Sequence, residues 1–323
     1  MKRVLITGGT GFIGYHLAKR LIASGVERID IADNFSRGPR DTDIAAFGDK
    51  IKIHKCDLRA TGALDPLPSD YDVIFHFAAL LGVANVRARP YAVLAENVAM
   101  TVAALSFAAR QKNLSRFVFA STSEVYAGTQ ATTGVPVPTP EDVVITVADP
   151  HEPRSTYALS KIYGESLTMH SSLPFTIVRP HNVYGPRMGQ VHVIPELLAR
   201  TYKAHDGDKL EVYSPAHTRT FCYVDDAVEL IRRAAQQPEA AGEFLNVGAQ
   251  TPEIRIDDLA TQIIKVVGRN VKIAPQPPTP GSPPRRCPDM QKATRLLGYS
   301  AKTGLAEGLE RTYAWYRERV LVG

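Results

Sequence analysis

Apolar segments of two kinds alternate along the first 180 residues of the chain. Short runs of apolar and β-branched residues predict strands, and longer segments with apolar residues every three or four positions predict helices. The predicted strands are residues 2–7, 28–32, 51–55, 72–77, 116–121 and 174–179, and the predicted helices are residues 12–24, 91–112 and 156–172. Repeated strand–helix units predict an α/β fold, a doubly wound parallel sheet of the Rossmann type with helices on both faces.

Beyond about residue 186 the pattern loosens, and proline and glycine become more frequent. The elements predicted there are strands 210–213, 244–247 and 271–274 and helices 193–205, 225–236, 256–267, 289–297 and 305–319. We therefore expect a Rossmann domain over residues 1–180, to which some later segments return. A smaller C-terminal α+β domain over residues 181–323 is expected to bind the substrate.

Two proline-rich segments, residues 127–153 and 275–288, interrupt this pattern. Because proline fixes φ and lacks an N–H donor, we expect both segments to be irregular. The second is interpreted either as a surface linker or as a loop that covers a substrate and supplies Arg285 or Arg286.

A glycine-spaced turn follows the first predicted strand and precedes the first predicted helix. Gly8 suits a tight turn, Gly11 permits a close approach of phosphate to the backbone, and Gly14 permits close packing of the helix. Asp33 ends the second predicted strand, where a carboxylate can accept a ribose 2′-OH. The sequence thus predicts a dinucleotide site. Asp33 favours NAD, since a carboxylate repels a 2′-phosphate; the nearby Arg37 is the one argument for NADP.

Composition narrows the remaining function classes. The chain has 323 residues, of which 44% are hydrophobic and 22% are charged, and its net charge is +5. Lys and Arg do not cluster in runs of five or more, so we expect no nucleic-acid partner. No uninterrupted apolar stretch reaches eighteen residues and the three cysteines lack metal-ligand spacing, so we expect a cytoplasmic protein with buried free thiols, no membrane segment and no metal.

The candidate catalytic residues are a tyrosine and a lysine four positions apart. Tyr157 and Lys161 fall in a predicted helix, where this spacing places both on one face. A lysine ammonium and an oxidised nicotinamide ring would lower the pKa of the phenol and make it a base. Thr122, Ser123 and Glu124 follow the strand at 116–121 and supply polar groups at the edge where such sheets bind ligands.

With these motifs the chain resembles the extended short-chain dehydrogenases that modify nucleotide sugars. The resemblance covers nearly the whole chain and rests on the segments 7–14, 33–34, 56–58, 76–79, Asn97, 121–126, 157–161, 179–186, 219–226 and 286–289. It implies that Tyr157 is the base, that Lys161 lowers its pKa and binds the nicotinamide ribose, and that Thr122 binds the sugar 4-OH.

The resemblance also implies a set of binding residues. For NAD these are Gly8, Gly11, Phe12, Ile13, Gly14, Asp33, Asn34, Asp57, Leu58, Ala78, Ala79, Asn97, Tyr157 and Lys161, with Asp57 and Leu58 beside the adenine. For the nucleotide sugar, with UDP as the default nucleotide, they are Leu80, Asn182, Val193, Tyr213, Arg219 and Arg286. Helices 91–112 and 156–172 pair two subunits in similar enzymes, so a homodimer is expected.

The same family oxidises the sugar at C4 and then follows one of several branches. A 4,6-dehydratase that resembles this chain would have Asp where Ser123 stands, and a serine is a weak acid. Thr122, Ser123 and Glu124 look like those of UDP-glucuronate decarboxylases, but residues 158–160 look like those of epimerases. We therefore place a 4-epimerase first and keep a decarboxylase or dehydratase that uses Glu124 as the alternative. A non-catalytic NAD(H)-binding redox sensor is the alternative from another class.

Overall fold

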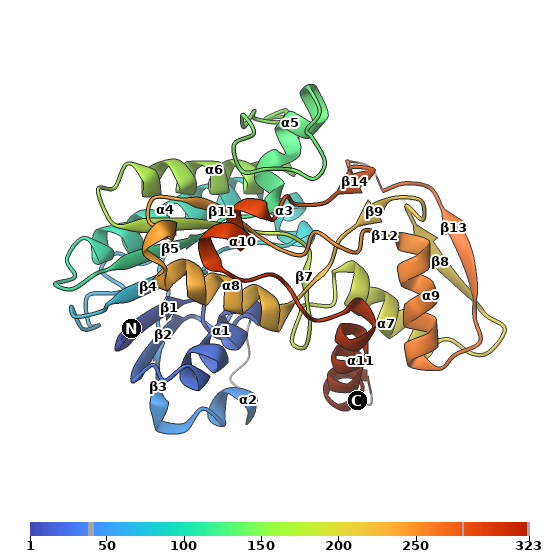
Figure 1. Ribbon diagram of the computed structural model, residues 1–323, viewed down its shortest axis with the longest axis horizontal. Coiled ribbons are helices and arrows are strands. Elements are labelled where there is room, and N and C mark those ends of the chain that lie inside the picture. The colour runs from blue at the N-terminus through green and yellow to red at the C-terminus, as the bar shows by residue number, and fades with distance from the viewer. Residues whose placement is uncertain (38–41, 280, 322–323) are drawn as a thin grey trace.

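A seven-stranded parallel sheet forms the centre of the molecule in a computed structural model that describes residues 1–37, 42–279 and 281–321 (Figure 1). Its strand order is β11-β6-β5-β4-β1-β2-β3, and each neighbouring pair is parallel. The strands are β1 (Arg3–Thr7), β2 (Arg28–Asp33), β3 (Ile51–Lys55), β4 (Val73–His76), β5 (Arg116–Ala120), β6 (Phe175–Pro180) and β11 (Phe244–Val247). The doubly wound Rossmann-type sheet predicted from the sequence is confirmed.

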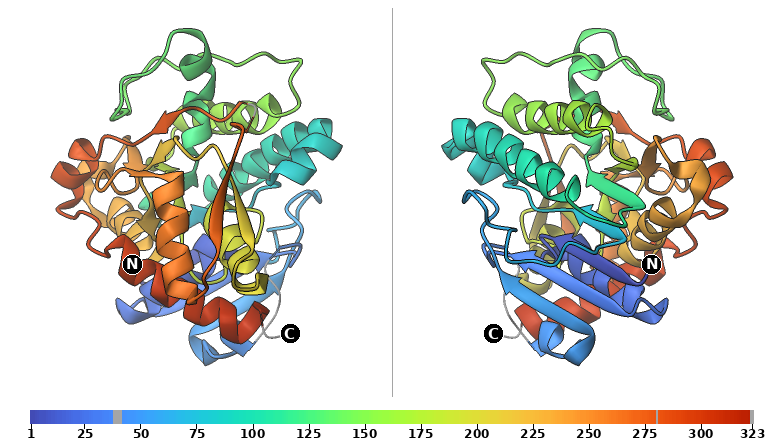
Figure 2. Two further views of the ribbon diagram at one scale, coloured as in Figure 1. Left: turned by 90° about the vertical axis from the view of Figure 1, so that its right-hand side faces the viewer. Right: turned by 90° about the vertical axis from the view of Figure 1, so that its left-hand side faces the viewer.

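Helices cover both faces of this sheet (Figure 2). On one face, α1 (Phe12–Ala23) packs beside α8 (Val224–Gln236), and on the other α4 (Pro90–Ala108) packs along α6 (Ser155–Met169). Strand residues such as Ile6 and Val118 face the first layer, whereas Leu5 and Phe119 face the second, because side chains alternate along a strand. The central strands are therefore apolar on both sides, as a doubly covered parallel sheet requires.

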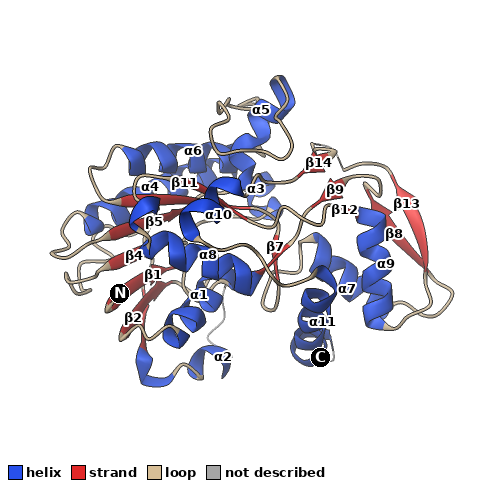
Figure 3. Ribbon diagram, viewed as in Figure 1, coloured by secondary structure: helices blue, strands red, loops and turns tan. Residues whose placement is uncertain are grey.

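The C-terminal part of the chain adds short strands and helices at one end of the large sheet (Figure 3). Its strand pairs are β7 (Val183–Tyr184) with β10 (Cys222–Tyr223), β8 (Lys209–Tyr213) with β13 (Lys272–Gln276), and β9 (Thr218–Arg219) between β12 (Ile254–Arg255) and β14 (Arg285–Arg286). Its helices are α7 (Val193–Lys203), α9 (Ile256–Val267) and α11 (Leu305–Tyr316), whereas α10 (Gln291–Leu297) packs against α8 and β11. The remaining short helices are α2 (Thr42–Ala45), α3 (Val83–Ala88) and α5 (Ala127–Thr132).

Both proline-rich segments contain more regular structure than the sequence predicted. Pro275 lies in β13, which is paired only with β8, and a strand with a free edge tolerates a residue without an N–H donor. Arg285 and Arg286 form β14 beside β9, and Ala127–Thr132 forms α5. The expectation that residues 275–288 are wholly irregular is therefore wrong, since strand pairing with distant residues overrides the local proline signal.

Helix α4 qualifies the expectation of no membrane segment. Among the described residues it is the one helix long and apolar enough to cross a membrane, with a mean hydropathy of 1.4 over eighteen residues. The helix contains Glu96 and Asn97, two polar residues that interrupt its apolar run in the sequence. The core helix of a folded domain passes the same test, and α4 packs against α6 and β4.

Gly164 sets the distance between α6 and the sheet. A Cβ atom at this position would overlap Cζ of Phe119 in β5, so α6 lies as close to the strand as a glycine permits. We predict that Gly164→Ala lowers the stability by about 1–3 kcal/mol, because an overpacked contact displaces the helix. A melting curve measures the effect. Gly304→Ala is the control, since nothing lies within 4 Å of a Cβ there, and equal melting temperatures for the two variants would contradict the prediction.

Candidate active site

The predicted site residues gather at the carboxyl edge of the large sheet, where β1, β2, β4 and β5 end. This is the edge at which open α/β sheets bind ligands. At the end of β1, Gly8 has a φ of +71°, and a Cβ there would lie 2.7 Å from the backbone N of Ala78. A Cβ at Gly14 would lie 2.5 Å from the carbonyl oxygen of Gly8. The turn therefore requires glycine at both positions, and helix α1 begins on it with no acidic residue in its first turn.

Asp33 is fixed beside this turn. Its buried carboxylate accepts hydrogen bonds from the backbone N–H of Thr10 at 3.0 Å and of Phe35 at 2.7 Å. A carboxylate held at the end of β2, next to the N-terminus of α1, matches the predicted ribose and diphosphate contacts of a dinucleotide. The residues that are present thus fit NAD.

Two further residues predicted for the cofactor have strong partners of their own. Asp57 accepts a bidentate pair from Arg59, at 2.8 and 2.5 Å, and the Arg59 side chain holds the pKa of that carboxyl well below its usual range. The Asn97 amide binds both the N–H and the C=O of Leu80, at 2.7 and 2.9 Å. Asn97 therefore braces the loop after β4, which carries Ala78, Ala79 and Leu80.

Lys161 lies about one turn after the predicted catalytic tyrosine on helix α6. Its Nζ donates to the carbonyl oxygen of Ala120 at 2.8 Å and lies 5.0 Å from the centre of the Phe119 ring. Burial lowers the pKa of Lys161 to about 8, and the charge of Glu165 opposes that shift. The ammonium is therefore attached to the end of β5, the strand that leads into Thr122.

Tyr157 and Thr122 are brought together as predicted, but the pKa of the phenol differs from the expectation. Burial and then the charge of Glu124 raise the pKa of Tyr157 to about 12, while a hydrogen bond with Thr122 and the charge of Arg37 oppose the rise. The chain without cofactor thus does not show the expected lowering of the Tyr157 pKa by Lys161. When bound, NAD⁺ supplies a positive ring and an acceptor for hydride, and Lys161 and Arg37 are the cations that the chain adds.

Glu124 connects this centre to the C-terminal part of the chain. Its carboxylate accepts a hydrogen bond from Nη1 of Arg286 at 2.8 Å and lies 3.6 Å from Nη2 of Arg154. The charge of Arg286 lowers the pKa of Glu124 despite its burial, so the carboxylate is ionised. The sequence analysis missed Arg154. The sequence feature that could have identified it is its position three residues before Tyr157, about one helical turn away.

The other residues predicted for the nucleotide sugar surround Arg286 only in part. Strand pairing places Arg219 beside Arg286, and Arg219 donates to Ser282 Oγ at 2.9 Å. Burial and the charge of Arg286 lower the pKa of Arg219 to about 10. Asn182 donates to the carbonyl oxygen of Thr220 at 2.9 Å. Val193 and Tyr213 are exposed at the start of α7 and the end of β8.

A buried polar network between α6 and the strand ends holds the elements that carry Tyr157, Lys161 and Thr122. The sequence did not predict it. Glu165 accepts two hydrogen bonds from Arg179, both 2.8 Å long, and one from Ser121 at 2.6 Å. Arg179 also donates to the hydroxyl of Tyr126, which donates to Asn246. The network therefore joins α6 to the ends of β5, β6 and β11.

Comparison with known proteins identifies the family that uses this arrangement. Residues 4–248 match the model of the NAD dependent epimerase/dehydratase family. The chain belongs to this family. It is 34% identical to UDP-N-acetyl-alpha-D-glucosaminuronate decarboxylase of Bacillus cytotoxicus, and the match covers 98% of this chain and 98% of that relative.

Solved structures agree with this assignment. A UDP-galactose 4-epimerase is 28% identical with a TM-score of 0.80, over 98% of this chain and 99% of that one. The UDP-glucuronic acid 4-epimerase of Bacillus cereus, in complex with UDP-glucuronic acid and NAD, is 26% identical with a TM-score of 0.84 over the same shares. The chain is thus an NAD-dependent enzyme of the epimerase/dehydratase family. The interpretation as a non-catalytic redox sensor is set aside.

We predict that Tyr157→Phe lowers substrate-dependent NAD reduction by about 10²- to 10⁴-fold, because a positioned proton acceptor is removed. Stopped-flow absorbance of the transiently reduced nicotinamide measures this rate. Tyr163→Phe is the matched control, since Tyr163 lies on the same helix with an exposed side chain. An equal loss in both variants, or none in Tyr157→Phe, would contradict the assignment of Tyr157 as the base.

Proposed function

We propose that this enzyme oxidises a UDP-uronic acid at C4 and then removes its C6 carboxylate as CO2. The observation that carries this proposal is the ionised Glu124 between Arg286 and Arg154, beside Tyr157. The relationship to a UDP-uronate decarboxylase, 34% identical over almost the full length of both chains, supports the same branch. NAD, held by the glycine turn and Asp33, would supply the acceptor for the C4 hydride and the source of that hydride at the end of the cycle.

The arginine pair suits a uronic acid because it offers more donors than Glu124 accepts. A guanidinium carries five N–H groups, and Glu124 uses one of those on Arg286. The remaining donors of Arg154 and Arg286 can bind a second carboxylate, and bidentate arginine–carboxylate pairs are strong and directional. A 4-epimerase acting on a neutral sugar needs only Tyr157, Thr122 and Lys161 with room for the keto sugar to turn.

The proposed reaction balances with the residues at hand. Tyr157 takes the proton of the C4 hydroxyl, and Thr122 orients that hydroxyl. In the resulting β-keto acid the C5–C6 bond breaks, CO2 leaves, and the electron pair passes into the C4 enolate. A proton then adds to C5, hydride returns to C4, and Tyr157 gives its proton back to the C4 oxygen. Because Glu124 is ionised, we propose that it orients the arginines and a proton-donating water.

The 4-epimerase that we placed first from the sequence remains the second candidate. Two observations favour it, namely residues 158–160 and the similarity to a UDP-glucuronic acid 4-epimerase. Under either candidate we propose that residues 181–323 outside the large sheet bind the nucleotide sugar, with Arg219 and Asn182 near its diphosphate. Arg286 would join them in an epimerase acting on a neutral sugar, where no uronate carboxylate has to be held.

Mass spectrometry of the products distinguishes the branches. We predict that the NAD-loaded enzyme converts UDP-glucuronate or its 2-acetamido analogue to a product lighter by CO2 and leaves UDP-glucose and UDP-galactose unchanged. A product of unchanged mass and altered retention would instead establish epimerisation, and a loss of water would establish dehydration. Either result would overturn the decarboxylase proposal.

A variant of Glu124 tests the residue on which the proposal rests. Glu124→Gln is expected to slow CO2 release by about 10²-fold, because the neutral amide holds the arginines less firmly. Glu152→Gln is the matched control, since Glu152 is exposed two residues before Arg154. Unchanged CO2 release by Glu124→Gln would show that the arginine-bracketed carboxylate does not serve the reaction.

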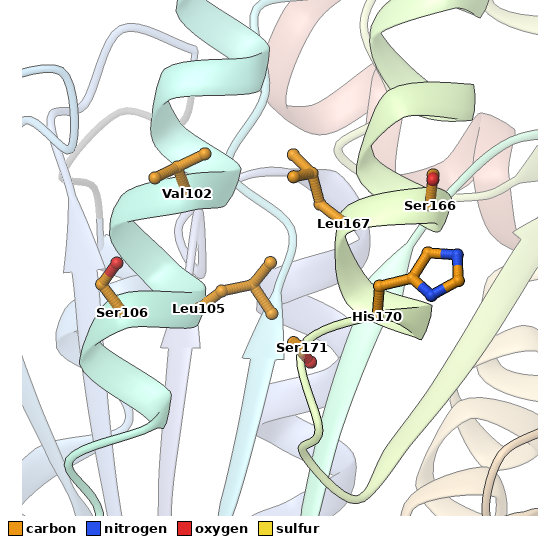
Figure 4. Close-up of a pocket in the computed structure, with 7 residues that line it drawn as sticks. All are labelled: Val102, Leu105, Ser106, Ser166, Leu167, His170 and Ser171. Carbon is orange, nitrogen blue, oxygen red and sulfur yellow. The ribbon is translucent and has the colours of Figure 1, made fainter.

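We also propose that two copies of the chain associate through α4 and α6. A pocket of about 410 Å³ lies between these helices on their outer side (Figure 4). Its lining residues are Val102, Leu105, Ser106, Ser166, Leu167, His170 and Ser171. Val102 and Met169 are exposed apolar side chains on the same pair of helices, and such patches typically mark protein–protein contacts.

We predict that Val102→Glu converts this dimer to a monomer, because a buried unpaired carboxylate at the interface strongly disfavours association. Light scattering after gel filtration measures the mass. Val144→Glu is the control, since Val144 is an exposed valine outside the two helices. A monomeric wild-type protein, or a dimeric Val102→Glu variant, would refute this mode of association.

A further inference from the structure

Arg37 enters the proposed reaction only through the effect of its charge on Tyr157, and its contacts point to a second role. It follows Asp33 by four residues, in the loop after β2. Its side chain crosses the carboxyl edge of the sheet, and Nη1 lies 3.5 Å from the carbonyl oxygen of Leu81, in the loop after β4. Since β1 lies between β2 and β4, the side chain passes over the end of β1, where the glycine turn begins.

The surroundings of the Arg37 guanidinium place it between the two ends of the predicted cofactor site. A Cβ at Gly189 would lie 3.5 Å from its Nη2, so the loop after β7 also approaches it. Its charge acts on His192 and on Tyr157, which marks the nicotinamide end of the site. The backbone of Arg37 thus lies near Asp33, at the ribose end of the site, and its side chain extends toward Tyr157, at the nicotinamide end.

No carboxylate among the described residues balances this guanidinium. The group whose charge acts on Arg37 is Tyr157, which is a neutral phenol in the chain by itself. A cation held at 3.5 Å from a backbone carbonyl is therefore available for an anionic ligand. The diphosphate of NAD carries two negative charges. It joins the adenosine half of NAD, which is expected beside Asp33, to the nicotinamide half, which is expected beside Tyr157.

We propose that Arg37 binds the diphosphate of NAD on the side opposite the N-terminus of α1. The helix terminus and the glycine turn offer backbone N–H groups from below, and Arg37 adds the side-chain charge from above. This role replaces the interpretation of Arg37 as an argument for NADP, because the guanidinium reaches the loop after β4 and contacts Leu81 there. The proposal rests on NAD dependence alone and is independent of decarboxylation.

The diphosphate of the nucleotide sugar has the same chemistry as that of NAD. Arg219 and Arg286, paired on β9 and β14, belong to the C-terminal part of the chain and are the cations proposed for the sugar nucleotide. The NAD diphosphate is therefore the better match for Arg37, and binding of NAD and UDP must be measured separately.

Calorimetric titration of nucleotide-free protein with NAD, NADP and UDP tests the proposal. Arg37→Gln is expected to weaken NAD binding about 10- to 100-fold, which corresponds to the loss of a charge-assisted contact. Arg37→Lys is expected to lose less, because it keeps the charge. UDP binding is expected to remain within twofold of the wild type in both variants.

Arg28→Gln is the matched control. Arg28 is exposed at the start of β2, and its substitution removes the same charge at the opposite edge of the sheet. The proposal is overturned if Arg37→Gln binds NAD as the wild type does, or if it loses UDP in place of NAD. It is also overturned if the wild type binds NADP as tightly as NAD and Arg37→Gln loses only NADP. Melting curves of the variants exclude a folding defect.

Discussion

The buried ion pair between Glu165 and Arg179 is the constraint on which the geometry of the site depends. Two parallel N–H···O bonds of 2.8 Å join helix α6 to the end of β6, and Ser121 at the end of β5 adds a third bond to Glu165. Removing one partner of such a pair is far more destabilising than the pair is stabilising, because a buried charge is left alone. The pair therefore fixes α6 against two strands, one turn beyond Lys161.

The position of α6 in turn determines the electrostatics of the proposed chemistry. With the helix fixed, Lys161 reaches Ala120 at the end of β5, and Tyr157 meets Thr122. The chain by itself keeps Tyr157 protonated, since burial and Glu124 raise the pKa of the phenol. A base that ionises only when further positive charge arrives is inactive toward an alcohol until the oxidised cofactor is in place, which couples cofactor binding to proton removal.

The parts of this architecture that could be predicted from the sequence are those that local patterns encode. The glycine turn requires glycine for steric reasons, and Tyr157 and Lys161 lie on one helical face by spacing alone. The contacts that escaped prediction join residues far apart in the chain. Arg286 reaches Glu124 across 162 positions, and β14 forms among prolines because β9 lies beside it. No local pattern encodes such pairs, since the intervening fold creates them.

The surplus of positive charge at the site follows from these long-range pairs. Arg219 and Arg286 lie side by side on β9 and β14, and Arg154 lies across from them at the start of α6, with Glu124 between. Burial and repulsion by the charge of Arg286 lower the pKa of Arg219 to about 10. Glu124 and Glu253 offset part of this charge at Arg219, and an anionic ligand stabilises partly buried cations further. The proposed substrate, a nucleoside diphosphate of a uronic acid, carries more than one negative group and so matches this cluster of cations.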